Sequence, residues 1–322
     1  MTDAPAALPG GVVPPLCTPL SGDDEVDVAS VRRLVEHVLA AGVAGVFVAG
    51  STGEAAYLPD RLRADMLAAT VDAVAGRVPV WCGVIDTSTR RMLEHARVAQ
   101  RLGASALVAT VPFYSPTSPA EWPGHFAALH DAVDLPVLAY NIPAAVHSEL
   151  RPETTAALAE AGLIDGIKDS SGNLDVLRST LDLMQGKGFR VYTGSESLTD
   201  LALVLGADGL VPGLGNVDPA GYVRICEAVR RGDLPAARAE QDRIRTLQGI
   251  VDVPDRGRMG PYSAAIGAFK EAAHQLGAIA TARTNPPMVP LDDGEKRGIA
   301  RILAATGLSP DQPAETTAQS AS

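Results

Sequence analysis

Residues 162–184 read GLIDGIKDSSGNLDVLRSTLDLM, and this stretch sets the pattern from which the fold can be predicted. A short apolar run, 164–168, ends in a lysine; small polar residues follow at once, and a helical pattern occupies 173–184. Continuous apolar runs favour strands that are buried on both faces, whereas apolar residues three and four apart favour an amphipathic helix. The stretch therefore predicts a buried strand followed by a helix.

The same order of strand and helix recurs along the first two thirds of the chain. Apolar, often β-branched runs occupy 12–18, 45–49, 78–84, 106–111, 136–140, 164–168, 190–193 and 209–211. Helical patterns follow them, at 28–41, 61–75, 90–102, 121–132, 152–161, 173–184, 196–205 and 218–231. Eight strand-then-helix units over about 230 residues predict an α/β fold, a (β/α)8 TIM barrel.

The remaining sequence supports this choice and adds a C-terminal region. A doubly wound nucleotide-binding fold would need a Gly-rich turn after the first strand, where this chain has Thr18-Pro19-Leu20. Three further helical patterns, 234–251, 262–276 and 295–305, predict a C-terminal helical appendix. We expect the barrel over 1–232, a helical region packed on it over 233–308, and a disordered tail over 309–322.

The overall composition narrows the class of protein. The 322 residues are 46% hydrophobic and 20% charged, and the formal net charge is −11. An acidic chain is not expected to bind nucleic acid or an anionic membrane surface, because either partner would need a basic patch. The sequence has no apolar stretch long enough for a membrane span and no signal-peptide pattern, so we expect a cytoplasmic protein.

The cysteines and histidines predict neither a disulfide nor a metal site. The three cysteines, Cys17, Cys82 and Cys226, are far apart, and the first two lie in apolar runs that favour packed, reduced side chains. No two of the six histidines have the spacing of a metal-binding pair. A metal-dependent aldolase is thereby disfavoured, and we expect no metal and no cofactor.

Lys168 is the residue most suggestive of chemistry. The chain has only four lysines, and this one closes a predicted buried strand. A desolvated lysine can become a neutral nucleophile and form a Schiff base, which arginine cannot do. A structural lysine at a strand end is the alternative.

Four clusters fall at the predicted carboxyl ends of strands, where TIM barrels carry their catalytic groups. They are Gly50-Ser51-Thr52-Gly53-Glu54, Pro112-Phe113-Tyr114, Tyr140-Asn141 and Lys168. The amides and hydroxyls of the first cluster are suited to holding a carboxylate, and a phenol such as Tyr140 can relay protons. A capped turn and packed aromatic rings are the structural alternatives. If all four clusters point into one bowl, the catalytic interpretation of Lys168 gains weight.

The order of these motifs resembles the dihydrodipicolinate synthase/N-acetylneuraminate lyase family of class I pyruvate-dependent aldolases. The resemblance covers residues 11–291 and also includes Pro15-Leu16-Cys17-Thr18-Pro19-Leu20, Tyr140-Asn141-Ile142-Pro143, Gly166-Ile167-Lys168-Asp169-Ser170-Ser171-Gly172 and Gly206-Ala207-Asp208-Gly209-Leu210-Val211. It implies a Schiff-base lyase that cleaves or forms a carbon–carbon bond between pyruvate, or another 2-oxo acid, and an aldehyde or sugar-acid partner. A homotetramer or dimer of dimers is also implied.

The resemblance implies a role for each matching residue. Lys168 would form the imine and Tyr140 would shuttle protons. Ser51 and Tyr114 would be the hydroxyl partners of Tyr140, with Tyr114 reaching across a subunit interface. Ser51 and Thr52 would hold the carboxylate of the 2-oxo acid. The two pocket-lining backbone positions would be Gly194 and Val211.

The chain departs from the synthase pattern after Pro143. The synthases continue with a small residue and Arg-Thr-Gly, whereas this chain has Ala144-Ala145-Val146-His147, so Ala145 stands where an arginine would hold the second substrate's carboxylate. Pro212 also replaces a small hydroxyl residue. A 2-keto-3-deoxy sugar-acid aldolase or dehydratase, or an aldolase for an apolar aldehyde, fits the missing arginine. The alternatives are dihydrodipicolinate synthase proper and a non-catalytic 2-oxo-acid binding protein.

Overall fold

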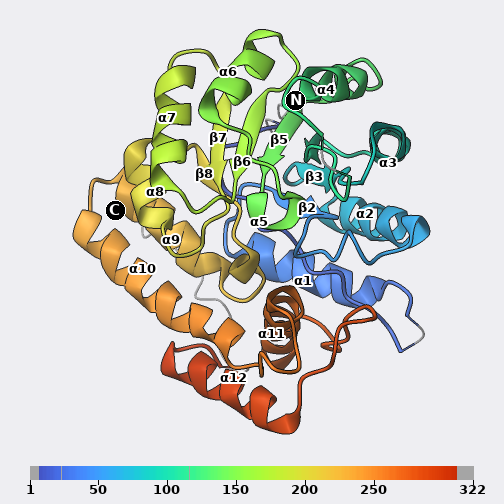
Figure 1. The fold of residues 1–322 in the computed structure, drawn as a ribbon. Coiled ribbons are helices and arrows are strands. Elements are labelled where there is room, and N and C mark those ends of the chain that lie inside the picture. Colours follow the sequence, from blue (N-terminus) through green and yellow to red (C-terminus); the bar gives the residue numbers. More distant parts are fainter. Residues whose placement is uncertain (1–6, 23, 116, 310–322) are drawn as a thin grey trace.

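The computed structural model describes residues 7–22, 24–115 and 117–309. At its centre, eight parallel strands form one sheet in the order β1-β8-β7-β6-β5-β4-β3-β2. The strands are β1 (Gly11–Val12), β2 (Val46–Val48), β3 (Val80–Gly83), β4 (Ala106–Ala109), β5 (Val137–Asn141), β6 (Gly166–Asp169), β7 (Arg190–Thr193) and β8 (Gly209–Leu210). The expected (β/α)8 architecture is confirmed (Figure 1).

Backbone hydrogen bonds between the segment that follows β1 and strand β2 close the sheet into a barrel. The Phe47 amide donates to the Pro14 carbonyl at 3.0 Å, and the Leu16 amide donates to the Phe47 carbonyl at 2.8 Å. The expected strand over 12–18 is nevertheless wrong in length, since β1 covers only Gly11–Val12. Pro14 and Pro15 have no amide hydrogen to donate, so the regular ladder stops there.

Helices alternate with the strands and lie around the barrel in Figure 1. They are α1 (Val28–Ala40), α2 (Asp60–Val74), α3 (Thr89–Arg101), α4 (Trp122–His130), α6 (Pro152–Glu160), α7 (Leu174–Met184), α8 (Thr199–Leu205) and α9 (Pro219–Arg230). All eight were expected, with bounds that differ by one to three residues. Two short elements were not expected: α5 (Pro143–Val146) after β5 and the 3-10 helix η1 (Gly213–Asn216) after β8.

The hydrophobic core has two layers. The inner layer fills the barrel with side chains from alternate strand positions, among them Phe47, Trp81, Leu138, Tyr192 and Val211. The outer layer lies between the strands and the surrounding helices. This alternation follows from the pleat of each strand, which points successive side chains to opposite faces of the sheet. Polar groups at inward positions therefore face the barrel interior.

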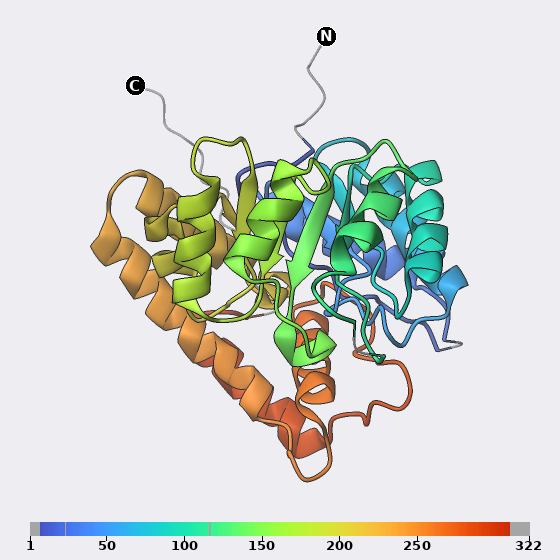
Figure 2. The same cartoon turned by 45° about the horizontal axis from the view of Figure 1, so that its top comes forward.

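The chain continues after the barrel into α10 (Leu234–Gln248), the 3-10 helix η2 (Gly249–Asp252), α11 (Pro261–Gln275) and α12 (Asp293–Ala305). Figure 2 shows the arrow of β5 pointing toward α5 and α11, so α11 lies at the carboxyl ends of the strands, whereas α10 runs along the side of the barrel. The expected helical appendix is confirmed. The exact division at residue 232 stays a prediction, and the expected tail lies outside the described residues except for Ser309.

An ion pair between two fully buried side chains joins α11 to the barrel. Lys270 of α11 pairs with Glu54, and neither side chain is exposed. Glu54 also accepts hydrogen bonds from the backbone amide and the side-chain amide of Asn285, at 2.8 and 2.9 Å. Because Glu54 closes the Gly50–Glu54 turn, this pair fixes the turn relative to α11. Across the described residues, no helix is long and apolar enough to cross a membrane.

Candidate active site

Strand register brings Lys168 and Tyr140 together. In the parallel pair of β5 and β6, Tyr140 lies opposite Lys168, so both side chains point from the same face of the sheet into the barrel. The Lys168 Nζ atom lies 4.2 Å from the centroid of the Tyr140 ring and 5.1 Å from that of Phe47. Two of the predicted residues therefore meet at the mouth of the barrel.

Burial changes the protonation of Lys168. The residue is 4% exposed, and loss of water around the ammonium group lowers its pKa from the usual 10.5 to about 7, although the charge of Glu196 opposes this shift. An amine with that pKa is partly neutral at neutral pH and is thus available as a nucleophile. An ordinary structural lysine at a strand end would keep its charge in water.

Hydroxyl groups surround the Tyr140 phenol. Burial raises the pKa of Tyr140, and hydrogen bonds with the side chains of Ser51 and Ser170 oppose the increase. Ser51 also hydrogen-bonds with Tyr262, whose pKa is raised by burial and by the proximity of Tyr140. Ser51 therefore links two phenols, an arrangement that can pass a proton between a buried base and the solvent side.

Tyr262 is the member of this group that the sequence did not reveal. It belongs to the first turn of α11, 211 positions after Ser51 in the chain, and no local pattern distinguishes it from other tyrosines at helix starts. Tyr114, by contrast, is 91% exposed in the single chain. Its predicted role as a hydroxyl partner across a subunit interface stays a prediction.

Gly194 gives Lys168 the room it needs. A Cβ atom at position 194 would lie 3.0 Å from the Lys168 Cε atom and 2.0 Å from the Ser170 hydroxyl oxygen. A side chain at position 194 would therefore overlap the Ser170 hydroxyl and press on the Lys168 side chain. Val211, the other residue predicted to line the pocket, is buried in the inner core layer. The hydroxyl of Thr52, which was predicted to hold the carboxylate, lies 3.1 Å from where a Cβ atom of Gly213 would be. The binding roles of Gly194, Val211 and Thr52 stay predictions.

Glu196 is a second residue that the sequence interpretation missed. It follows β7 and accepts hydrogen bonds from the Leu214 amide at 3.1 and 3.2 Å and from the Tyr222 hydroxyl at 3.0 Å. Burial raises the pKa of Glu196, and these donors and Lys168 lower it. A carboxylate three residues beyond a strand end was a detectable signal, because that is where barrel enzymes place charged groups.

A cavity of about 250 Å³ opens beside Ser51, which hydrogen-bonds with Tyr140. It is lined by Ser51, Thr110, Ala145, Tyr262 and eight other residues from the segments after β2, β3, β4 and β5 and from α11. Ala145 thus lines the same cavity as the serine that hydrogen-bonds with Tyr140. Ala145 and Val146 both line this cavity.

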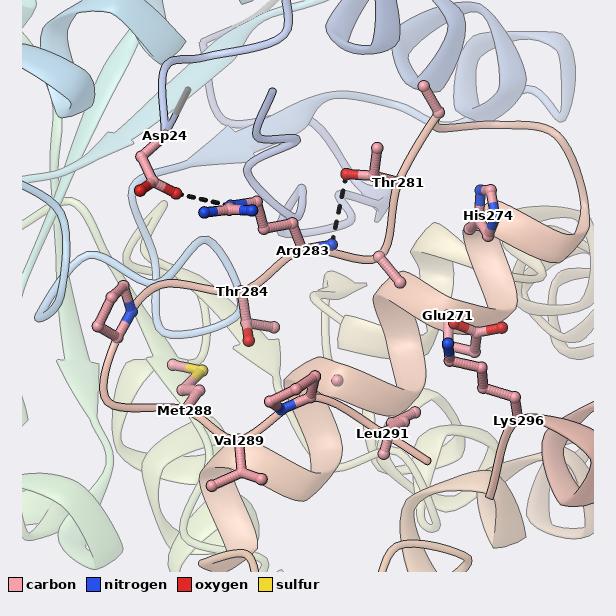
Figure 3. Close-up of a pocket in the computed structure, with 15 residues that line it drawn as sticks. Asp24, Glu271, His274, Thr281, Arg283, Thr284, Met288, Val289, Leu291 and Lys296 are labelled. Atoms are coloured by element: carbon pink, nitrogen blue, oxygen red, sulfur yellow. Dashed lines mark hydrogen bonds and ion pairs between the residues drawn. The ribbon is translucent and has the colours of Figure 1, made fainter. Parts of the chain in front are cut away.

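Two other hollows lack the reactive groups. The larger, of about 530 Å³, lies between α11 and residues 280–291, where Arg283 donates to Asp24 at 2.6 Å (Figure 3). It contains neither Lys168 nor Tyr140. The second, of about 310 Å³, lies beside α2 and α3 and is also away from the lysine.

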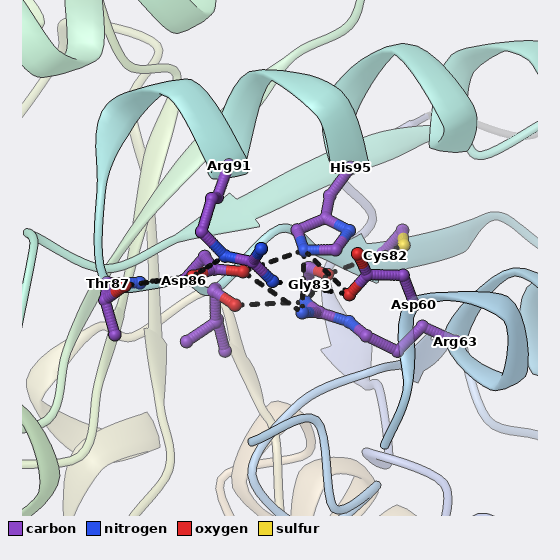
Figure 4. Close-up of polar contacts among 9 residues, drawn as sticks. Asp60, Arg63, Cys82, Gly83, Asp86, Thr87, Arg91 and His95 are labelled. Carbon is purple, nitrogen blue, oxygen red and sulfur yellow. Dashed lines mark hydrogen bonds and ion pairs between the residues drawn. The ribbon is translucent and has the colours of Figure 1, made fainter. Parts of the chain in front are cut away.

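The hollow beside α2 and α3 contains a self-contained polar network (Figure 4). His95 Nε2 lies 2.9 Å from Asp86 Oδ2 and 3.0 Å from the Arg63 guanidinium. Burial opposes ionisation of Asp86, but hydrogen bonds from Arg91 and His95 outweigh it and lower the pKa of Asp86 to about 2. The polar groups of this network hydrogen-bond with one another, so a structural role explains their burial.

The fold and the site define a class: a TIM-barrel enzyme with a deprotonatable lysine at the end of its sixth strand and a tyrosine beside it. Comparison with known proteins agrees. The chain matches the Dihydrodipicolinate synthetase family over residues 8–306 and belongs to that family. Its members are carbon–carbon lyases, and this chain is one of them.

Relatives and solved structures cover most of the chain. An uncharacterized DapA-like lyase of Halobacterium salinarum is 35% identical over 313 residues, which span 95% of this chain and 99% of the relative. The 4-hydroxy-tetrahydrodipicolinate synthase of Xanthomonas campestris pv. campestris is 39% identical over 235 residues, 73% of this chain and 77% of the relative. YagE, a prophage protein of the family from E. coli K12 in complex with pyruvate, is similar with a TM-score of 0.86 at 30% identity, over 93% of this chain and 99% of its own.

Proposed function

We propose that this protein is a class I aldolase or lyase in which Lys168 forms a Schiff base with the keto carbon of pyruvate or another 2-oxo acid. One observation carries the proposal: a buried lysine with a pKa of about 7 lies over the ring of Tyr140. The second substrate is an aldehyde or sugar acid, and the reaction makes or cleaves a carbon–carbon bond.

The chemistry begins with nucleophilic attack. The neutral Lys168 amine adds to the keto carbon, and the hydroxyl formed takes a proton from Tyr140 and leaves as water, so that a protonated imine and a Tyr140 phenolate form. The imine withdraws electrons, so the adjacent methyl carbon loses a proton to Tyr140 and becomes an enamine nucleophile. The enamine carbon then attacks the carbonyl carbon of the aldehyde. Hydrolysis of the new imine releases the product and restores the lysine, and the reverse sequence cleaves the same bond.

The proposed function also assigns residues that bind the 2-oxo acid, an oligomeric state and a cellular location. The hydroxyls and amides of Ser51 and Thr52 hold the carboxylate of the 2-oxo acid, and Gly194 and Val211 line its pocket. Tyr114 reaches the site of a neighbouring copy in a homotetramer or dimer of dimers, which its 91% exposure in the single chain supports. The protein acts in the cytoplasm. YagE, which binds pyruvate in its solved structure, supports pyruvate as the first substrate.

Dihydrodipicolinate synthase proper is the second candidate, favoured by the name of the Xanthomonas relative. Against it is Ala145 at the position of the carboxylate-binding arginine. Removing one partner of such a charge pair costs about 2–5 kcal/mol of recognition. A coupled assay with pyruvate and aspartate semialdehyde should therefore show little turnover, and rapid turnover would favour the synthase.

Borohydride trapping tests the proposed function. Incubation with pyruvate and sodium borohydride should add the mass of a reduced pyruvate imine to the intact chain, and peptide mapping should find it on Lys168. A chain that traps no pyruvate, or traps it on another lysine, would contradict the proposed mechanism. A non-catalytic 2-oxo-acid binding protein would bind pyruvate without this adduct.

A further inference from the structure

The cavity beside Tyr140 is where a second substrate would meet the enamine, because Ser51 lines it and hydrogen-bonds with Tyr140. Its volume of about 250 Å³ lies just below the roughly 300–1,000 Å³ of pockets for drug-sized ligands. A single ring or a short branched chain suits this space. Its walls are largely apolar side chains: Ile85, Phe113, Ile142, Ala144, Ala145 and Val146.

The lining carries no ionised group. Of the twelve described residues that form it, none is Asp, Glu, Lys, Arg or His. A carboxylate placed there would lose water without gaining a cationic partner, and an unpaired buried charge is strongly unfavourable. A polyhydroxylated chain meets a related difficulty, because each of its hydroxyls needs a partner. Four of the twelve lining residues carry hydroxyls, and two of these, Ser51 and Tyr262, already bond to each other. The cavity therefore disfavours both acidic and sugar-like aldehydes.

One polar group in the lining has no partner within the described structure. The Thr110 hydroxyl is buried, at 3% exposure of the residue, and forms no hydrogen bond with any described residue. Leaving such a group unsatisfied costs about 1–3 kcal/mol. A ligand carrying one oxygen at that point would restore the missing bond, and an aldehyde has one oxygen.

We infer that the second substrate is a neutral, apolar aldehyde with an aromatic or branched hydrocarbon group, and that Thr110 donates a hydrogen bond to its carbonyl oxygen. This inference rests on the proposed function, because it assigns the partner of the same enamine. The hydrocarbon group lies against Phe113, Ile142 and Val146. Ala145 keeps the pocket free of charge.

The step balances without any further reactant. The enamine carbon forms a bond to the aldehyde carbon, and the carbonyl π electrons move to the aldehyde oxygen. That oxygen takes the proton that Tyr140 removed from the methyl carbon. Water then hydrolyses the imine, so the product is a 4-hydroxy-2-oxo acid that contains all the atoms of the two substrates.

A substrate comparison on the full-length enzyme tests the inference. With pyruvate at saturation, benzaldehyde and 2-methylpropanal should give kcat/KM at least about tenfold above succinic semialdehyde and glyceraldehyde. Formation of the 4-hydroxy-2-oxo acid is followed by mass spectrometry. Higher kcat/KM with either polar aldehyde would overturn the inference. The proposed function would stand if pyruvate is still trapped on Lys168 without aldehyde, whereas absence of trapping would remove both.

Ala145→Arg sharpens the test. The added guanidinium should lower kcat/KM for benzaldehyde about tenfold and raise it for succinic semialdehyde by a similar factor. Ala304→Arg, on the exposed side of α12, is the matched control and should change neither. If Ala145→Arg folds and leaves the preference unchanged, the cavity does not hold the aldehyde and the inference is wrong.

Thr110→Val tests the proposed hydrogen bond. The variant keeps the shape of the side chain but loses the hydroxyl, so kcat/KM for benzaldehyde should fall about tenfold while pyruvate trapping on Lys168 is unchanged. Thr110→Ser should restore most of the loss. Equal kcat/KM in Thr110→Val and wild type would remove Thr110 from its assigned role.

Discussion

The two ends of the bowl are built by different parts of the fold. The lysine end consists of Lys168 and Tyr140 on neighbouring strands, paired in register and almost fully buried. The aldehyde end, around Ala145, consists of loops, the short helix α5 and the first turn of α11, and part of its lining is exposed. The first end holds the amine of Lys168, whereas the described lining of the second has no Asp, Glu, Lys, Arg or His.

The strands of the barrel fix the residues of the imine chemistry, whereas the loops after the strands can change the residues that contact the second substrate. A shift of one residue in strand register would turn Lys168 or Tyr140 away from the interior, so the sheet itself preserves the imine chemistry. Loops after the strands tolerate substitution without disturbing the sheet. An alanine in place of an arginine at position 145 can therefore change the second substrate while leaving the first half of the reaction intact.

Loss of the Lys168 amine should have the largest effect on the rate, because it removes the nucleophile of the lysine end and leaves the aldehyde end unchanged. Lys168→Met should lower the rate of aldol formation or cleavage by at least about 10⁴-fold, because no imine can form. The rate is measured with pyruvate and an accepted aldehyde. Lys187→Met is the matched control: that lysine pairs with Glu160 on the surface, and its loss should leave the rate unchanged. Substantial activity in Lys168→Met would rule out the imine.

Tyr140→Phe should separate imine formation from proton transfer. Removal of a positioned acid–base group typically costs about 10²–10⁴-fold, so exchange of the pyruvate methyl protons with D2O should slow by that factor while borohydride still traps pyruvate. NMR follows the exchange. Tyr192→Phe removes a buried phenol that donates only to the Pro9 carbonyl, and exchange should continue normally there. Unchanged exchange in Tyr140→Phe would remove Tyr140 from the relay.

The sequence predicted the lysine end well because its signals are local. Lys168 closes an apolar run and Tyr140 lies near the end of another, and in a parallel barrel both ends open to the same bowl. Ser51 lies in a turn between a strand and a helix, where hydroxyls that cap or bind are common. Each of these signals extends over only a few residues.

Contacts between segments far apart in the chain could not be predicted from such local signals. Tyr262 reaches Ser51 from a helix that begins more than 200 residues later, and Lys270 finds Glu54 in the same way. One sequence contains nothing that pairs these positions. The first strand was overestimated for a different reason: its apolar composition suggested a long run, but Pro14 and Pro15 cannot donate to the ladder.

The buried pair of Glu54 and Lys270 should matter more for stability than any surface pair. Glu54→Gln leaves the Lys270 ammonium buried without a counter-ion, which should lower the free energy of unfolding by about 3–5 kcal/mol. Glu36→Gln, at an exposed pair with Arg77, should cost less than about 1 kcal/mol. Urea titration of both variants measures the difference. Equal losses would show that the buried pair does not anchor the Gly50–Glu54 turn to α11.

The smallest expected effect is a shift in the pH dependence of imine formation at Lys168. Only the neutral amine attacks the keto carbon, and the pKa of Lys168 is about 7. Imine formation with pyruvate should therefore fall about tenfold per pH unit below that value and level off above it. Glu196 raises the pKa of Lys168 through its charge, so in Glu196→Gln the midpoint should move to lower pH. Glu160→Gln, a change of the same kind at the surface, should leave the midpoint in place. A midpoint that stays near its original pH in Glu196→Gln would mean that burial alone sets the protonation of Lys168.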